Sequence, residues 1–143
     1  VQSYAHAQQH KHLPEMLSYS GTAVPPIFTP SVANYYKGLL VEIPLFATEL
    51  NNASPRQVHE VLRQRYAQDP FINVASLGAY ELMENGFLNP TGCNNSNRMD
   101  LMVLGDAQRI ILCARYDNLG KGAAGAAVQN LNIMLGIEES LGL

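Results

Sequence analysis

The apolar residues of one segment, 51–70, recur with the spacing of an amphipathic helix. The segment NNASPRQVHEVLRQRYAQDP (51–70) is the clearest helix, because Ser54 is a good N-cap and Pro55 suits the first helical position. Its apolar residues are expected on one face: Val58, Val61, Leu62 and Tyr66. His59 is then expected on the solvated side.

Other segments follow strand patterns. GLLVEIPLFA (38–47) is apolar at most positions of both faces, which is typical of a strand covered on both sides. MDLMVLGDAQRIILCARY (99–116) predicts a β-hairpin around a turn that contains Gly and Asp. TAVPPIFTP (22–30) is an edge strand or an extended loop, because its prolines lack ladder donors. Residues 71–98 are expected to form loops and short strands.

Two further helices lie near the ends. HLPEMLSYSG (12–21) predicts a short helix with Pro14 in its first turn and Gly21 at its end. DNLGKGAAGAAVQNLNIML (117–135) is expected to be helical after its start, with Gly136 as the C-cap. The order of helices and long strands predicts an α+β fold with helices on one face of a sheet, in a single domain over residues 1–143.

Composition narrows the classes of partner. Charged residues make up only 15% of the chain, against about 25% in typical proteins. Either another domain or subunit covers part of the surface, or this is ordinary scatter. The net charge of -3 and the absence of a basic run argue against nucleic acid and anionic membranes. No apolar stretch is long enough to span a bilayer and no signal peptide is visible, and two cysteines without a CxxC pattern favour the reducing cytoplasm.

The first candidate site is the HKH run. His10 and His12 flank Lys11, just before Pro14 and Glu15 at the start of the expected helix. An imidazole there is suited to proton transfer near neutral pH. Two histidines could also ligate a metal, but no third ligand follows at a recognisable spacing, or they could lie on a solvated surface. These residues alone leave the three readings open.

The second candidate site is YDNLGKG (116–122). Asp117 or Asn118 is a good N-cap, and the Gly-rich turn could bind an anion, although it lacks the GxGxxG and P-loop patterns. The small residues that follow would permit close approach of another element or a ligand: Gly122, Ala123, Gly125 and Ala126.

Taken together, four blocks resemble one enzyme family. The blocks are Tyr4 with HKHLPE (10–15), IFTP (27–30), KGLL (37–40) and YDNLGKGAAGAAVQNLNIMLG (116–136). Their order and sequence resemble those of the N-acetyl-gamma-glutamyl-phosphate reductases. The resemblance implies a mixed, largely antiparallel sheet, like the C-terminal domain of glyceraldehyde-3-phosphate dehydrogenase-type enzymes. It also implies a homo-oligomer and an NADP-binding Rossmann domain that these residues lack, toward which the helix of 117–143 would pack.

The resemblance also assigns chemistry. The family reduces N-acetyl-gamma-glutamyl phosphate, a small-molecule acyl phosphate, with NADPH to a semialdehyde in arginine biosynthesis. His10 would be the acid-base partner of a catalytic cysteine. His12, Lys11 and Glu15 would orient or contact the substrate, and Asn118 would approach the nicotinamide of NADP. No metal is implied. Lys11 stands where the family commonly has arginine; lysine keeps the charge but lacks the guanidinium fork that binds a carboxylate or phosphate through two parallel hydrogen bonds.

The family's nucleophile is missing from these residues. It stands in a Pro-Gly-Cys turn ahead of the histidine block, and this sequence has no such turn. Cys113 is expected to be an inert core thiol, and Cys93 matches no nucleophile motif. The chain alone is therefore expected to be inactive. The alternatives are a non-catalytic oligomerisation or binding module, and a related enzyme such as aspartate-semialdehyde dehydrogenase.

Overall fold

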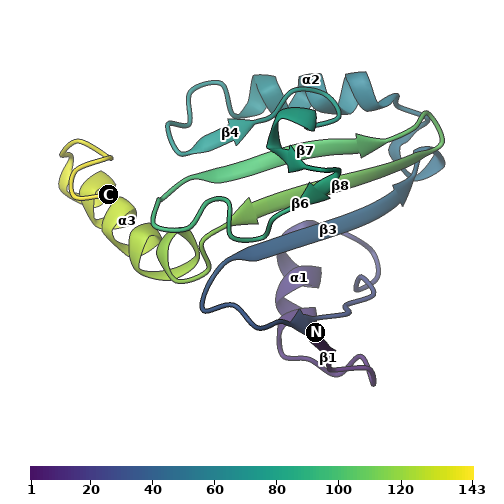
Figure 1. Ribbon diagram of the computed structural model, residues 1–143, viewed down its shortest axis with the longest axis horizontal. Coiled ribbons are helices and arrows are strands. Elements are labelled where there is room, and N and C mark those ends of the chain that lie inside the picture. Colours follow the sequence, from purple (N-terminus) through teal and green to yellow (C-terminus); the bar gives the residue numbers. More distant parts are fainter. The chain divides into compact units, whose positions relative to one another are not determined.

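The computed structural model describes residues 1–143, which form two compact units, residues 1–36 and residues 37–143. Each unit is described by itself. The chain contains three α-helices and three sheets, most of whose strand pairs are antiparallel (Figure 1). The predicted α+β class with a mixed, largely antiparallel sheet is confirmed. That the two units make up one domain stays a prediction.

The first unit is a short helix set between two short strands. Strands β1 (Gln2–Ser3) and β2 (Ser31–Val32) pair antiparallel, and helix α1 (His12–Ser20) lies between them in sequence. Gly21 ends α1 in the left-handed conformation with φ 70°, as predicted. Residues 22–30 form no strand, so the loop alternative for this proline-containing segment is confirmed.

The second unit is built on a four-stranded sheet in the order β3-β8-β7-β4. Strands β3 (Leu39–Phe46), β8 (Arg109–Tyr116) and β7 (Met99–Gly105) are antiparallel, and β4 (Ile72–Val74) runs parallel to β7. The predicted hairpin over 99–116 is confirmed. Its turn is held by Asp106, whose Oδ1 accepts from the N–H groups of Gln108 and Arg109, both at 2.9 Å.

Helix α2 (Pro55–Arg65) packs against β7 and β4. Ser54 caps it as predicted, accepting from the Gln57 N–H. The predicted face of this helix is wrong at two positions. Val61 is 63% exposed, whereas the half-buried His59 places Nε2 2.8 Å from the Ala75 carbonyl oxygen. Because each residue turns the helix by about 100°, His59 lies on the buried arc with Val58 and Leu62, and Val61 falls just outside it.

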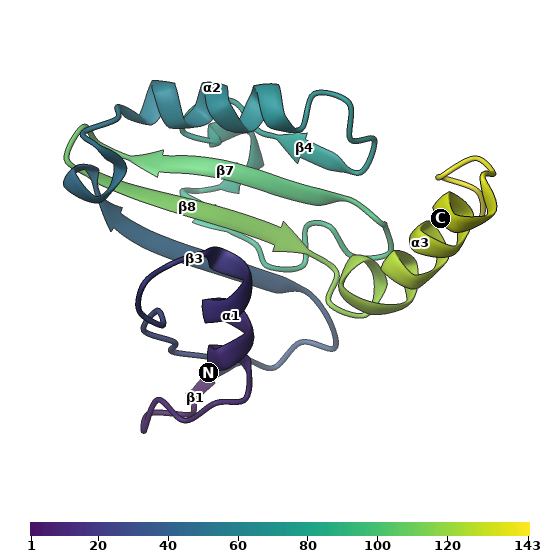
Figure 2. The same cartoon turned by 180° about the vertical axis from the view of Figure 1, so that it is seen from behind.

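The remaining elements are short, except for the C-terminal helix. They are η1 (Ala47–Leu50), η2 (Tyr80–Leu82), β5 (Met83–Glu84), β6 (Phe87–Leu88), the π-helical turn η3 (Gly120–Ala124) and α3 (Gly125–Leu135). Gly136 ends α3 with φ 66°, as predicted. Both views show α3 projecting away from the end of β8 (Figures 1 and 2).

Strand β3 is less covered than its sequence predicts. Its residues 41–44 and Phe46 are exposed, and Ile43 is 50% and Phe46 64% exposed. The physical reason is its place in the sheet. β3 pairs with β8 alone and forms one edge, whereas α2 packs against β7 and β4 toward the opposite edge and leaves β3 without its cover (Figure 2). The expectation of cover on both faces is wrong within residues 1–143.

The core of the second unit lies between the sheet and the loops that follow β4. It contains the buried side chains of Ala75, Ala79, Met102 and Cys113. Cys113 is 3% exposed, which confirms the predicted core thiol. No helix combines the length and the apolar composition that a membrane span requires.

Candidate functional site

The first unit gathers the rings of the histidine block and its neighbouring motifs. The ring centroid of His10 lies 4.6 Å from that of His12, 5.1 Å from Phe28 and 5.8 Å from Tyr4. His10 is half-buried while His12 is exposed. Three blocks that are separate in the sequence, Tyr4, HKH and IFTP, therefore meet around one imidazole.

A backbone hydrogen bond sets the orientation and tautomer of His10. The N–H of His12, the first residue of α1, donates to His10 Nδ1 at 3.2 Å. An imidazole nitrogen that accepts a hydrogen bond carries no hydrogen, so the neutral ring bears its hydrogen on Nε2. The start of α1 thus presents Nε2 of His10 as a hydrogen-bond donor.

The loop before His10 is tied to the IFTP segment by a residue that sequence reasoning missed. Gln8 Nε2 donates to the Phe28 carbonyl oxygen and the Phe28 N–H donates to Gln8 Oε1, both at 2.8 Å. Nothing in the sequence marks Gln8, because it is a polar residue in a loop 20 positions from its partner.

Lys11 and Glu15 are exposed, and neither makes a side-chain hydrogen bond or ion pair. The structure therefore does not join them to the two imidazoles. Lys11 and His10 do border an open pocket of about 410 Å³, which has a mainly apolar lining. The apolar lining residues are Leu13, Pro14, Leu17 and Pro25.

In the second unit, the YDN motif forms a buried polar junction around Asp117. Its Oδ1 accepts from the N–H groups of Leu119 and Gly120, so Asp117 is the cap of the following helical turn. Its Oδ2 accepts from the Asn95 N–H at 2.9 Å and lies 2.9 Å from Lys37 Nζ. Burial by itself would raise the pKa of this carboxyl, but the bonds from Lys37 and the three N–H groups outweigh burial and hold the pKa far below its usual range.

Asn118 lies beside this junction with its amide oriented by the backbone. Its Oδ1 accepts from the Gly38 N–H at 2.8 Å. Gly38 has φ 120°, and a Cβ there would lie 2.6 Å from the Pro90 carbonyl oxygen, so glycine is required for this approach. The Asn118 side chain is exposed and its nitrogen has no partner in the chain. It is therefore an amide donor held ready for an acceptor.

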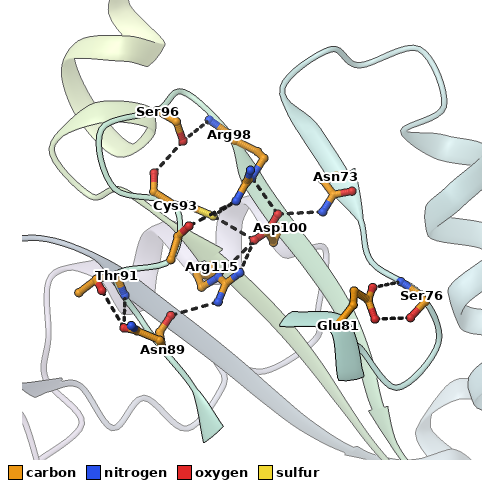
Figure 3. A network of polar contacts seen from close by, with 11 residues as sticks. Asn73, Ser76, Glu81, Asn89, Thr91, Cys93, Ser96, Arg98, Asp100 and Arg115 are labelled. Carbon is orange, nitrogen blue, oxygen red and sulfur yellow. Dashed lines mark hydrogen bonds and ion pairs between the residues drawn. The ribbon is translucent and has the colours of Figure 1, made fainter. Parts of the chain in front are cut away.

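A second buried junction, around Asp100, was missed from the sequence (Figure 3). Asp100 is fully buried and accepts from Arg115 Nη2 at 2.7 Å, Asn73 Nδ2 at 2.9 Å and the Cys93 thiol at 3.1 Å. It also forms an ion pair with Arg98, whose Nε lies 3.1 Å from Asp100 Oδ1. The bonds from its partners offset burial and lower the pKa of Asp100. The sequence contains one signal for this junction, because Asp100 is an acidic residue within an otherwise apolar strand.

Neither cysteine is placed as a nucleophile. Burial, followed by the contact with Asp100, raises the pKa of Cys93. Burial, followed by the charge of Glu42, raises the pKa of Cys113 to about 12. Both thiols are therefore protonated near neutral pH, and a protonated thiol is a poor nucleophile. No group of three or more His, Cys, Asp or Glu side chains is arranged to hold a metal ion.

The small residues after the YDN motif are used for packing within the second unit. An added Cβ at Gly125 would meet Asn97 Oδ1 at 2.3 Å. The same Asn97 donates from Nδ2 to Gln129 Oε1 at 2.9 Å, and Lys121 Nζ donates to that oxygen at 2.5 Å. The close approach predicted for this helix is thus to the loop before β7.

Comparison with known proteins identifies the family of this chain. Residues 1–118 match the family described as semialdehyde dehydrogenase, dimerisation domain. The chain belongs to this family. The resemblance noted in its sequence motifs is confirmed, since N-acetyl-gamma-glutamyl-phosphate reductases are among the proteins it matches.

Three such relatives illustrate the range of similarity. N-acetyl-gamma-glutamyl-phosphate reductase 2 of Nostoc sp. is 46% identical over 138 residues, which are 94% of this chain and 43% of the relative. The reductase of Brucella suis is 39% identical over 131 residues, covering 90% and 42%. That of Burkholderia orbicola is 36% identical over 139 residues, covering 95% and 44%. This semialdehyde dehydrogenase-family chain therefore spans less than half the length of the curated relatives it matches.

Proposed function

We propose that these residues belong to an NADPH-dependent reductase that converts N-acetyl-gamma-glutamyl phosphate to the corresponding semialdehyde and phosphate. The observation that carries the proposal is the half-buried imidazole of His10. Its Nδ1 is engaged by the His12 N–H, which leaves Nε2 as a hydrogen-bond donor. The relatives named for this reaction share up to 46% of their residues with the chain over the aligned part, which supports the choice of substrate.

In this proposal, His10 serves a cysteine nucleophile outside these residues. The thiolate attacks the acyl carbon, the bond from that carbon to the phosphate oxygen breaks, and a thioester and phosphate result. NADPH supplies a hydride when it is bound. His10 Nε2–H donates a hydrogen bond to the oxygen that becomes negative as the thioester is reduced, and this bond stabilises the developing charge. The charge leaves that oxygen when the aldehyde is released and the thiolate re-forms.

Other residues have supporting roles in the proposal. Asn118 donates from its free amide nitrogen to the nicotinamide carboxamide, since Gly38 already holds its oxygen. His12, Lys11 and Glu15 lie on the exposed start of α1 and contact the substrate from there. The dimerisation domain described for the family supports a homo-oligomer. A cytoplasmic location stays a prediction.

The test uses the full-length protein that contains this sequence. We expect it to reduce N-acetyl-gamma-glutamyl phosphate with NADPH, and to form the acyl phosphate from semialdehyde, phosphate and NADP in reverse. His10→Asn should lower kcat by about 10²–10⁴-fold with little change in KM. His6→Asn is the matched control, because His6 is an exposed histidine of the same unit whose ring bonds only to Ser3.

Different results would reject different parts of the proposal. If the wild-type protein prefers aspartyl phosphate, it is the related aspartate-semialdehyde dehydrogenase. If it has neither activity, the remaining alternative is a non-catalytic oligomerisation or binding module. A His10→Asn variant with unchanged kcat would remove His10 from the mechanism. The 143-residue chain is expected to show no activity by itself, because neither buried cysteine can replace the missing nucleophile.

A further inference from the structure

Gln8 bonds to Phe28 in the manner of a paired strand. Its side-chain amide donates to the Phe28 carbonyl oxygen and accepts from the Phe28 N–H, both at 2.8 Å. Two opposed hydrogen bonds fix distance and orientation together, whereas one bond leaves a hinge. We propose that Gln8 is a positioning residue that holds the His10 imidazole in register with Phe28; this inference rests on the proposed function.

The backbone at Gln8 supports a use for its side chain. Gln8 has φ 55°, a left-handed conformation that side chains other than Asn, Asp and Gly seldom adopt. Its N–H donates to the Ala5 carbonyl oxygen at 3.0 Å, and Ala5 also has a positive φ of 57°. Such conformations persist where the surroundings hold them, and they gather at functional sites. Here the two bonds to Phe28 hold the turn.

The Gln8–Phe28 hydrogen bonds restrain His10 in two ways. Gln8 precedes His10 by two residues, so fixing its side chain restrains the backbone that carries the imidazole. The Phe28 ring contacts His10 at 5.1 Å and His12 at 6.3 Å between ring centroids. Gln8 therefore connects the backbone that carries His10 to the Phe28 ring that packs against it, and it does not touch the reacting atoms. Loss of the two Gln8–Phe28 hydrogen bonds would displace His10 Nε2 but would not remove it.

The experiment compares three variants of the full-length protein. Gln8→Ala removes both bonds, and Gln8→Gly removes them while easing the positive φ. Gln2→Ala is the control, because Gln2 is an exposed glutamine of the same unit that makes no side-chain hydrogen bond and does not line the pocket beside His10. A displacement of about 1 Å at a reacting group can lower the rate about 10²-fold. We expect kcat to fall about 10- to 100-fold in both Gln8 variants, KM to stay within about threefold and Gln2→Ala to match the wild type.

A spectroscopic readout is independent of turnover. The ring protons of His10 lie near the Phe28 ring, so their NMR signals carry its ring-current shift, and ¹³C-labelled histidine reports them. Both Gln8 variants should move these signals toward those of a solvent-exposed histidine. Gln8→Glu, which keeps an acceptor for the Phe28 N–H and loses the donor, should give an intermediate shift and serves as the test if the smaller variants do not fold.

Two results would overturn the inference. If Gln8→Gly keeps wild-type kcat and ring signals, the backbone conformation alone is required and the side chain positions nothing. If kcat falls while the His10 signals stay in place, Gln8 acts by another route. Should the wild type lack reductase activity, the proposed function fails. The ring signals then decide the role of Gln8, since unmoved signals reject it and displaced signals support it.

Discussion

Asp117 joins three segments of the second unit through one carboxylate that is fully buried. Lys37 comes from the segment before β3, Asn95 from the loop before β7, and the N–H groups of residues 119 and 120 from the following helical turn. Removing one partner of a buried ion pair leaves the other charge uncompensated. The three segments are therefore held by a group that tolerates little change.

We expect Asp117→Asn to lower the free energy of unfolding by about 3 kcal/mol, because Lys37 loses its counter-charge and the N–H donors lose a charged acceptor. Urea unfolding at pH 7 measures this. Asp69→Asn is the control, since Asp69 forms an exposed pair with Arg65 at 3.4 Å and should change little. Equal effects of the two substitutions would show that the junction adds no stability.

The low pKa of Asp117 gives this stability a defined pH dependence. A carboxyl whose pKa is lower in the folded than in the unfolded state stabilises above its unfolded pKa, which is about 3.9. The contribution then declines as the pH falls toward the folded value. The difference between wild type and Asp117→Asn should be constant from pH 7 to about pH 5 and should shrink below about pH 4. A difference that grows on acidification would contradict the assignment.

The two thiols give a second prediction for single residues. Cys93 and Cys113 are buried, and burial raises the pKa of Cys113 to about 12. Since only the thiolate reacts, a disulfide reagent should label neither in the native 143-residue chain at pH 8 and both in denaturant. Time-resolved absorbance of the released thiol measures both rates. Rapid native labelling would show that one thiol is accessible.

At the scale of an element, packing around α3 is expected to reverse the usual preference of a helix for alanine over glycine. Alanine in place of a helical glycine normally stabilises by about 0.5–1 kcal/mol. At Gly125 the added Cβ would lie 2.3 Å from Asn97 Oδ1, so we expect Gly125→Ala to lower the melting temperature. Asn130→Ala, at an exposed position of α3, should raise it slightly.

A double variant separates the clash from other effects. Combining Gly125→Ala with Asn97→Ala removes the atom that the new Cβ meets, so the double variant should be more stable than the sum of the two single changes predicts. Additive losses would show that Asn97 is not what excludes a side chain at Gly125.

The sequence predicted elements better than contacts. The bounds of α1, α2, α3 and the β7–β8 hairpin follow from caps, glycines and apolar periods, which act within a few residues. The motifs predict His10 and Asn118 as site residues, and their roles stay a prediction. Gln8 and Asp100 were missed because their partners are distant in sequence, at separations of 20 for Phe28 and 15 for Arg115. The helical period also misplaces His59, because a polar residue on a helix face is expected to be solvated whereas the ring of His59 bonds to the Ala75 carbonyl oxygen.

For the whole molecule, the exposed edge strand β3 bears on assembly. Val41 and Ile43 are 38% and 50% exposed on the same face of this strand, and its free edge presents unpaired backbone groups. An exposed apolar surface on β3 fits a family that is described by its dimerisation domain. We therefore expect the full-length protein to associate through a surface that includes β3.

Ile43→Lys tests this in the full-length protein by sedimentation velocity. A charge placed on that surface would have to be desolvated on association, so the variant should sediment as a smaller species and its dissociation constant should rise at least tenfold, which corresponds to about 1.4 kcal/mol. Tyr80→Lys is the matched control, because Tyr80 is 79% exposed and belongs to η2 and not to β3. If both variants retain the wild-type sedimentation coefficient, β3 lies outside the interface. If both dissociate, the added charge acts through net repulsion and β3 has no special part in assembly.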